Sequence, residues 1–223
     1  DLMKQIQELI LYEDNHMLVV HKPPGILSQG DETNDHNLLT LLKQYLKEKY
    51  QKPGNVYLGL IHRLDRMTGG VMVFAKTSKA ASRLSASIRN RTFKKHYYAI
   101  VEGVMPEKVG QMVDYLRKDE TEVKSYVTTV EGGKQALLSY RVLEQTEKAA
   151  LVDIALETGR HHQIRVQFSS RGFPLMGDTL YGSSVKMPLA LYAYKLEFLH
   201  PVTKESMAFE VKPQGKPWDD FLK

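Results

Sequence analysis

The stretch Ile61-His-Arg-Leu-Asp-Arg-Met-Thr-Gly-Gly-Val-Met-Val-Phe-Ala-Lys76 passes from a charged loop through two glycines into an apolar strand. Its one carboxylate, Asp65, lies among three side chains that can carry positive charge, His62, Arg63 and Arg66. Nearby positive charge favours the ionised form of a carboxylic acid, so we expect Asp65 to be charged. An ionised aspartate at this junction suits a nucleophile or a base that meets an anionic substrate. The alternative is a turn hydrogen bond before Thr68, which is a common use of aspartate in loops.

The segments around this loop predict strands and helices in the first half of the chain. Short apolar runs bounded by turn residues predict strands at 17–22, 56–61 and 70–76. Apolar residues at helical spacing predict helices at 37–50 and 78–90, the second with Ser78 as its N-cap. On this second helix Lys79 and Arg83 lie one turn apart, and we expect them to face outward together.

The second half of the chain is rich in strands. Five consecutive strands without an intervening helix are predicted at 97–101, 111–116, 124–130, 135–143 and 150–157. A helix is expected at 161–171, and alternating apolar residues predict two later strands around 192–198 and 207–211. This order argues against a doubly wound parallel sheet and for an α+β fold on a largely antiparallel sheet. No repeat or linker marks a boundary, so we expect one domain over residues 1–223.

Composition excludes several classes of protein. The 223 residues include no cysteine, which rules out disulfides and thiolate-based zinc or iron–sulfur sites. The eight histidines show no metal-binding spacing, so no metal is expected. No apolar run approaches the roughly 18 residues that a membrane-spanning helix needs. We therefore expect a soluble protein, with the cytoplasm as its compartment.

Positive charge is concentrated in two stretches. No acidic residue occurs between Asp65 and Glu102, where eight basic residues lie, and this exceeds the net charge of +5 for the whole chain. A second acid-free stretch between Glu157 and Asp178 contains three arginines and two histidines. Such stretches on an otherwise slightly acidic chain indicate a polyanionic partner. The alternative for the first stretch is an ordinary solvated helix face.

Four motifs occur in an order that resembles the RluA-type pseudouridine synthases. The first is Val19-Val-His-Lys-Pro-Pro-Gly25, and His62-Arg-Leu-Asp65 is the second. Lys95-His-Tyr-Tyr-Ala99 is the third. The fourth and longest is Thr158-Gly-Arg-His-His-Gln-Ile-Arg165, followed by Gly172-Phe-Pro-Leu-Met-Gly-Asp-Thr-Leu-Tyr-Gly182. The resemblance covers nearly the whole chain.

Two positions depart from the family pattern. Thr68-Gly69-Gly70 stands where the family usually has Thr-Ser-Gly, and Gln167 stands where histidine is usual. Neither position belongs to the motif residues expected to be catalytic. We therefore expect the two changes to adjust the activity without abolishing it.

The resemblance implies a fold and a reaction. The implied fold is the pseudouridine synthase fold, with a mixed, largely antiparallel sheet flanked by helices and two lobes around a catalytic cleft. The implied reaction is the isomerisation of uridine to pseudouridine within RNA, without a cofactor. In the family the motif aspartate is catalytic, a tyrosine lies beside it and an arginine pairs with it. These roles fall on Asp65, Tyr97 and Arg165.

The chemistry also predicts residues that hold the substrate. The target base must leave its stack, and the detached uracil must be retained between apolar walls, for which we select Leu64, Ile164 and Val166. Arg63 is expected to fill the space that the base vacates or to hold neighbouring phosphates. The full set of expected RNA-binding residues is His62, Arg63, Arg66, Lys79, Arg83, Arg89, Arg91, Lys94, Arg160 and His161.

Other interpretations of these residues remain open. Tyr97 also fits an ordinary aromatic residue packed on a sheet, and Arg165 fits a structural ion pair elsewhere. A non-catalytic RNA-binding module that kept the fold is the alternative function. An aspartate-dependent hydrolase or lyase acting on a phosphorylated sugar would need a glycine-rich phosphate loop or metal ligands, which we do not find.

The expected partner is a structured RNA, either ribosomal or transfer RNA. We do not find the small S4-like RNA-binding domain that many relatives carry. Its absence would leave substrate choice to the catalytic domain and would argue against a large-subunit ribosomal target. No apolar surface stripe is left over, so we expect a monomer.

Overall fold

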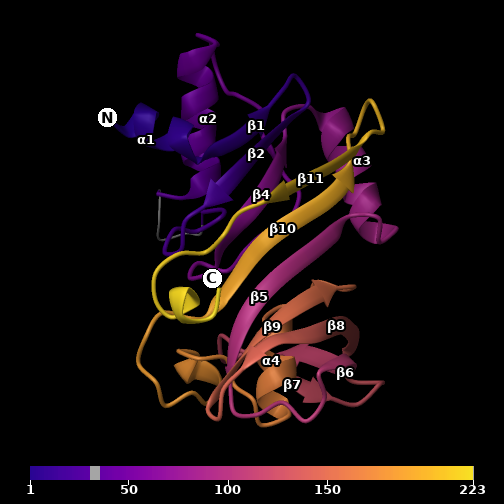
Figure 1. Ribbon diagram of the computed structural model, residues 1–223. Helices are drawn as coiled ribbons and strands as arrows, with labels where there is room; N and C mark the ends of the chain where they lie inside the picture. Colours follow the sequence, from indigo (N-terminus) through magenta and orange to yellow (C-terminus); the bar gives the residue numbers. More distant parts are fainter. Residues whose placement is uncertain (31–35, 223) are drawn as a thin grey trace. The chain divides into compact units, whose positions relative to one another are not determined.

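The computed structural model describes residues 1–30 and 36–222, and the chain divides into two compact units (Figure 1). The first unit comprises residues 1–94 and 193–212, and the second comprises residues 95–192 and 213–223. This division agrees with the two lobes expected from the sequence. Within the described part of the chain, we find no helix with the length and apolar character needed to cross a membrane.

In its described residues, the first unit is a sheet with three helices. Its elements are α1 (Leu2–Leu9), β1 (Ile10–Glu13), β2 (Met17–Lys22), α2 (Leu38–Lys49), β3 (Gly59–Leu60), β4 (Gly69–Ala75), α3 (Ser78–Arg89), most of β10 (Leu191–Leu199) and β11 (Ser206–Glu210). The strand order is β1-β2-β4-β10, with β3 paired to β4 and β11 paired to β10. The pairs β1–β2, β2–β4, β3–β4 and β10–β11 are antiparallel. Helices α1 and α2 lie together beside β1 and β2 in Figure 1.

Strand β4 passes through the core of the first unit, and all seven of its residues are buried. Val71 and Val73 pack with Leu84 of α3 in one hydrophobic cluster. Successive strand residues point to opposite faces, so Met72 and Phe74 face the other side of the sheet. An unbroken apolar run is typical of a strand that is covered on both faces. The loop that carries Asp65 therefore leads into one of the most deeply buried strands of the unit.

Gly70 allows a close approach between β4 and β10. Its φ is +145°, and a Cβ atom built there would overlap the carbonyl oxygen of Ala193 and lie 2.6 Å from the Ala193 Cβ. Only glycine adopts this backbone conformation readily and leaves that space empty. The second glycine after Asp65 is therefore required by the packing of the sheet.

Glu13, at the end of β1, is held by three donors from other elements. Its carboxylate accepts hydrogen bonds from the ammonium groups of Lys49 at 3.0 Å and Lys76 at 2.9 Å, and from the Tyr50 hydroxyl at 2.6 Å. Burial by itself would raise the pKa of Glu13. These hydrogen bonds outweigh burial and lower the pKa to about 2.

Asp14 connects the turn after β1 to the segment that follows β10. Its carboxylate accepts from the backbone N–H groups of His16 and Met17 and from the Tyr12 hydroxyl, and it lies 2.7 Å from His200 Nε2. Burial acts to raise the pKa of Asp14, but these hydrogen bonds, with the one from His200 first among them, lower it to about 2. The two adjacent carboxylates thus join four separate segments of the first unit.

The second unit is a five-stranded antiparallel sheet with one α-helix. Its elements are β5 (Lys94–Glu102), β6 (Val109–Lys118), β7 (Ser125–Thr128), β8 (Lys134–Gln145), β9 (Ala149–Leu156), α4 (Gln163–Ser170) and two 3-10 turns, η1 (Thr179–Tyr181) and η2 (Trp218–Asp220). The strand order is β5-β9-β8-β6-β7. The pairs β5–β9, β8–β9, β6–β8 and β6–β7 are antiparallel. Val166 of α4 packs against Leu116 of β6 and Ala136 of β8.

The sequence predicted most of these elements, including the five consecutive strands, with differences at their ends. The strand expected at 56–61 is reduced to Gly59–Leu60, and α4 begins two residues later than expected because His162 adopts a left-handed conformation with φ of 52°. The N-cap of α3 is Thr77 rather than Ser78, since the Thr77 hydroxyl accepts from the Ala80 N–H. Helix α1 and strand β1 were not predicted.

We predict that Gly70→Ala lowers the free energy of unfolding by about 3 kcal/mol, because the new Cβ must displace Ala193 from a packed sheet. The measurement is urea unfolding followed by circular dichroism. Gly54→Ala is the matched control: Gly54 also has a positive φ, +70°, but nothing lies within 4 Å of a Cβ there. Gly54→Ala should lower the free energy of unfolding by only about 1 kcal/mol. Equal costs for the two variants would show that close packing does not require Gly70.

We also predict that the first unit loses stability in acid as Glu13 and Asp14 are protonated. Both carboxylates have a pKa of about 2 in the folded protein, below the unfolded values of about 4. Their contribution is therefore complete above pH of about 4.5 and is lost as the pH falls towards 2. The loss should be of the order of 2 kcal/mol for each group, measured by urea unfolding over this pH range. If the free energy of unfolding fell equally with pH in the wild type and in the Glu13→Gln/Asp14→Asn variant, this prediction would be wrong.

Candidate active site

The loop that carries Asp65 is fixed by hydrogen bonds on both sides of that residue. Before it, the Ser28 hydroxyl donates to the Leu64 carbonyl oxygen at 2.8 Å, and the Leu64 N–H donates back to that hydroxyl at 3.1 Å. After it, the Thr68 N–H donates to the Asp65 carbonyl oxygen at 3.0 Å, which closes a turn. The Asp65 side chain is partly exposed, whereas Leu64 is only 6% exposed. The backbone that carries the Asp65 carboxylate is therefore held in a fixed position.

Lys22 is the main anchor of this loop. The residue is fully buried, and its ammonium group donates to the carbonyl oxygens of Pro23 at 3.1 Å, Arg66 at 3.0 Å and Thr68 at 2.9 Å. Burial lowers the pKa of Lys22 to about 8, while the charge of Asp65 acts in the opposite direction. In the sequence, Lys22 stood out only as the last residue of a predicted strand and as a member of the first motif. A lysine within a buried apolar run is itself a signal, because such a residue needs partners.

The Pro-Pro-Gly turn is joined to the same loop. The Gly25 N–H donates to the Arg66 carbonyl oxygen at 2.7 Å, and Arg66 Nε donates to the Gly25 carbonyl oxygen at 3.1 Å. Arg66 was expected to bind RNA, and its exposed side chain also has this structural contact. The first and second sequence motifs therefore form one local structure.

His62 lies at the start of the loop and packs inward. Its Nε2 accepts a hydrogen bond from the Val73 N–H at 3.2 Å, which requires this nitrogen to be unprotonated. Its ring lies edge-on to Phe93, with the ring centroids 5.3 Å apart. Arg63, by contrast, is exposed. Of the two, Arg63 is the one whose position suits contact with a large ligand.

Arg165 forms a buried, two-pronged ion pair with Asp178. Its Nε and Nη2 each lie 2.8 Å from an Asp178 carboxylate oxygen, and the side chains are 12% and 1% exposed. The guanidinium carbon also lies 5.1 Å from the centre of the Tyr181 ring. Such a planar pair fixes the orientation of the guanidinium group. Asp178 was quoted in the fourth motif, but the sequence did not reveal that it is a partner of Arg165.

A second polar cluster lies beside this pair. His162 Nδ1 is 2.7 Å from the Tyr181 hydroxyl, which accepts from the Ser125 N–H at 2.9 Å. The His161 and His162 rings stack with centroids 3.8 Å apart. Burial, followed by the charge of Arg165, lowers the pKa of His162 to about 3. His162 is therefore neutral at pH 7, and together with Tyr181 it forms a fixed wall beside Arg165.

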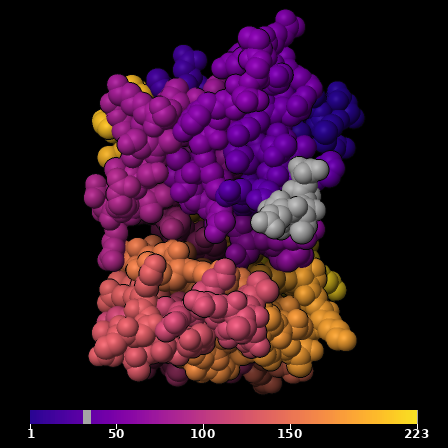
Figure 2. Space-filling view, turned by 180° about the vertical axis from the view of Figure 1, so that it is seen from behind, coloured from indigo at the N-terminus to yellow at the C-terminus, as the bar shows by residue number. Residues whose placement is uncertain are grey.

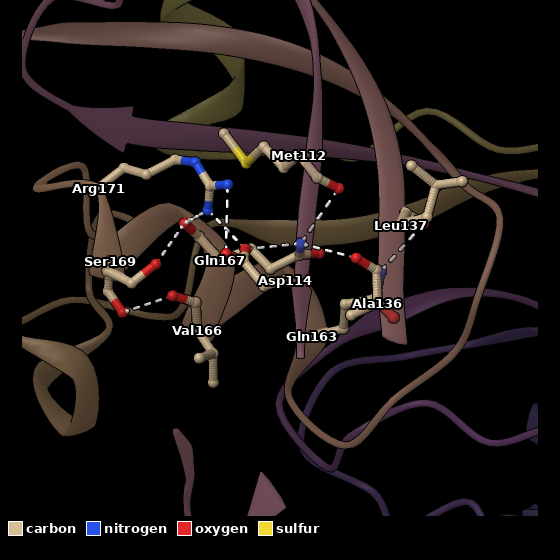
Figure 3. Close-up of polar contacts among 10 residues, drawn as sticks. Met112, Asp114, Ala136, Leu137, Gln163, Val166, Gln167, Ser169 and Arg171 are labelled. Atoms are coloured by element: carbon tan, nitrogen blue, oxygen red, sulfur yellow. Dashed lines mark hydrogen bonds and ion pairs between the residues drawn. The ribbon is translucent and has the colours of Figure 1, made fainter. Parts of the chain in front are cut away.

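Gln167 ties helix α4 to the sheet, as Figure 3 shows. The residue is fully buried, and its Nε2 donates to the carbonyl oxygens of Met112 and Ala136 and to the Asp114 carboxylate. Arg171 completes the network, because its Nη1 donates to Asp114 at 2.6 Å and to the Gln167 carbonyl oxygen at 3.0 Å. The glutamine that replaces the family's usual histidine thus holds the helix that carries Arg165.

The expected RNA-binding residues differ in how they are exposed. Lys79, Arg89, Arg91 and Lys94 are exposed, and the segment around α3, purple to magenta in Figure 2, lies at the surface of the first unit. Arg83 is only half exposed and donates to the Pro201 carbonyl oxygen at 2.9 Å, so it does not face outward with Lys79 as expected. In the second unit, Arg160 Nε donates to the Gln135 carbonyl oxygen at 2.7 Å.

The three residues expected to be catalytic belong to different units. Asp65 lies in the first unit, and Tyr97, 8% exposed on β5, lies in the second with Arg165. Of the expected pocket walls, Ile164 and Val166 are buried in the second unit and Leu64 is buried in the first. The structure thus describes the immediate support of each residue. That they act together stays a prediction.

Comparison with known proteins points to one family. A model of the family described as RNA pseudouridylate synthase matches residues 16–170. The chain is 37% identical over 206 residues to YhcT of Bacillus subtilis (strain 168), named as an uncharacterized RNA pseudouridine synthase; the match covers 90% of this chain and 67% of YhcT. It is also 37% identical over 212 residues to ribosomal large subunit pseudouridine synthase D of Nitrosomonas europaea, covering 90% and 60%.

A solved structure supports the same conclusion. Human RNA Pseudouridylate Synthase Domain Containing 4 is similar with a TM-score of 0.80 and 26% identity, covering 96% of this chain and 91% of that one. The chain spans 60% of the length of the Nitrosomonas relative and 67% of YhcT. With the family model matching most of its length and the fold agreeing, the chain belongs to the RNA pseudouridylate synthase family.

Proposed function

We propose that the protein isomerises uridine to pseudouridine within RNA, without a cofactor. The observation that carries this proposal is that hydrogen bonds hold the backbone around Asp65 in place. The aspartate of the family motif lies on a loop that the buried Lys22 and Ser28 hold on both sides. A carboxylate that must act at one atom of a bound nucleotide needs such a fixed position.

The reaction breaks the N1–C1′ bond, turns the uracil while it stays bound, and joins C5 to C1′. In the product, N1 carries a proton and C5 has lost one, so no oxidant or reductant is required. Asp65 attacks at C1′ or acts at the neighbouring 2′ carbon. Tyr97 stacks on the base and assists proton transfer when C5 loses its hydrogen.

Arg165 is proposed to keep Asp65 ionised and oriented. Its pair with Asp178 uses Nε and Nη2, which fixes the orientation of the guanidinium group. Neutral His162 and the ring of Tyr181 would hold the arginine in that position. Leu64, Ile164 and Val166, each less than 10% exposed, are proposed as the apolar surroundings that retain the uracil.

The substrate is proposed to be a structured RNA from which the target base is flipped, with Arg63 filling the vacated space or holding neighbouring phosphates. The exposed cations around α3 would follow the RNA backbone, so affinity should fall with salt. Ribosomal and transfer RNA are the candidate classes. Relatives named as ribosomal large subunit synthases make large-subunit RNA the first to test. We further propose that the protein works as a monomer in the cytoplasm.

We predict that Asp65→Asn abolishes tritium release from RNA that contains 5-tritiated uridine, while RNA binding is retained. Forming the C5–C1′ bond expels the C5 hydrogen, so release reports the isomerisation itself. The substrates are large-subunit ribosomal RNA and total transfer RNA, and filter binding measures affinity for each. If the wild-type protein binds these RNAs but releases no tritium, a non-catalytic RNA-binding module becomes the better explanation.

We predict that Asp178→Asn slows tritium release roughly 10- to 100-fold with little change in KM, because a neutral amide cannot hold the arginine with two charged hydrogen bonds. Asp119→Asn is the matched control. The Asp119 carboxylate accepts hydrogen bonds from Thr121 within its own loop, and the Asp119 N–H donates to the Lys124 carbonyl oxygen, so the rate should stay at the wild-type level. Thermal unfolding of both variants would separate a loss of fold from a loss of alignment. An unchanged rate in folded Asp178→Asn would remove the role proposed for this pair.

A further inference from the structure

A basic pocket lies in the second unit, where the ends of β6, β7 and β8 meet the start of α4. It has a volume of about 510 Å³. Its lining includes Leu116, Lys118, Ser125, Lys134, Arg160 and His161, with the turn at 131–133 along one side. Arg160 and His161 were expected to bind RNA, whereas Lys118 and Lys134 lie outside the acid-free stretches of the sequence and were not predicted.

Strand register places the two lysines on the same face of the sheet. Leu116 pairs with Lys134 on β8, and Lys118 pairs with Ser125 on β7. Paired residues share a face, and residues two apart on a strand also share one. Leu116 packs against Val166 of α4, so this is the face that the helix covers. Arg117 lies between Leu116 and Lys118 on β6 and also contributes to the pocket lining.

Arg160 is fixed at the edge of this pocket. Its Nε donates to the Gln135 carbonyl oxygen at 2.7 Å, and its backbone N–H donates to Gln163 Oε1 at 2.9 Å. His161 Nδ1 lies 2.7 Å from the Ser125 hydroxyl. Lys118 is near enough for its charge to contribute to the lowered pKa of His162. The pocket is thus built from side chains held by the sheet and by the start of α4.

The positive charge of the pocket is not neutralised within the described part of the second unit. The lining holds four cationic residues, Arg117, Lys118, Lys134 and Arg160, and one carboxylate, Glu131. The ion pairs described in this unit use other residues: Lys124–Glu122, Arg141–Asp153, Arg165–Asp178 and Arg171–Asp114. Clustered cations in a concave site attract anions and concentrate them locally.

The lining favours phosphate over a base. Among the lining residues there is no Phe, Tyr or Trp on which a base could stack. Arg and Lys are the residues that most often bind phosphate oxygens, and such contacts position a nucleic acid without reading its sequence. The volume exceeds what one phosphate ion needs and suits a short length of backbone.

We propose that this pocket binds a phosphodiester segment of the substrate RNA and so positions the strand on the second unit. The inference rests on the proposed function, because it takes RNA as the ligand. It adds Lys118 and Lys134 to the binding surface and makes Arg160 part of a defined site.

The test is the double variant Lys118→Gln/Lys134→Gln, measured by fluorescence anisotropy with a fluorescein-labelled RNA hairpin over a series of salt concentrations. Loss of two phosphate contacts should reduce the slope of log affinity against log salt by about 1.5. In tritium release, KM should rise severalfold while kcat is unchanged. The variant Lys118→Arg/Lys134→Arg, which keeps both charges, should restore the wild-type salt slope and KM. Lys148→Gln, an exposed lysine in the turn between β8 and β9, should behave as the wild type. A slope equal to that of Lys148→Gln would overturn the proposal.

A second experiment distinguishes the phosphates of RNA from the phosphate of a free nucleotide as the ligand of this pocket. Isothermal titration with uridine 5′-monophosphate should show no binding that depends on Lys118 and Lys134. Binding of this nucleotide that the double variant loses, with an unchanged RNA salt slope, would make the pocket a nucleotide site and overturn the proposal. The anisotropy measurement needs no catalysis. A reduced slope together with a wild-type protein that releases no tritium would therefore support the pocket while the proposed function failed.

Discussion

The buried ammonium group of Lys22 is the interaction on which the Asp65 loop depends. A cation without solvent contact is costly unless its three donors find acceptors, and here the carbonyl oxygens of Pro23, Arg66 and Thr68 supply them. Two of these oxygens belong to the residues that follow Asp65. The same group therefore satisfies its own hydrogen bonds and fixes the loop. A neutral side chain of similar length would not offer three donors to these oxygens.

The second unit supports its arginine by a comparable arrangement of buried polar groups. Asp178 accepts from Nε and Nη2 along one edge of the Arg165 guanidinium, and Tyr181 covers its face. Gln167 fixes the helix itself, since one amide group reaches three acceptors on β6 and β8. Its Oε1 atom is buried and, within the described residues, has no hydrogen-bond partner. Gln167 therefore ties the helix to the sheet, at the cost of one unsatisfied acceptor.

Charge along the sequence was an incomplete guide to the surface that we propose for RNA binding. Within or beside the basic stretches, Lys76 pairs with Glu13, Arg83 donates to a carbonyl oxygen, and Arg171 pairs with Asp114. These cations hold the fold together. Conversely, Lys118 is followed by acidic residues and Lys134 lies outside both basic stretches, but the two lysines share one face of the sheet. Counting charges in a window cannot separate these cases, because strand pairing decides which side chains gather.

The sequence by itself determined the elements whose pattern is local: the buried strand β2, the helices α2 and α3, the five consecutive strands and the order of the motifs. Apolar spacing and turn residues fix such features within a few positions. Tertiary structure decided the partner of Lys22, which bonds to Thr68 46 residues away, the pairing of Arg165 with Asp178, and the late start of α4. The physical reason is that a buried charge is stabilised by whichever acceptors the fold brings to it, and their separation along the chain leaves no local pattern.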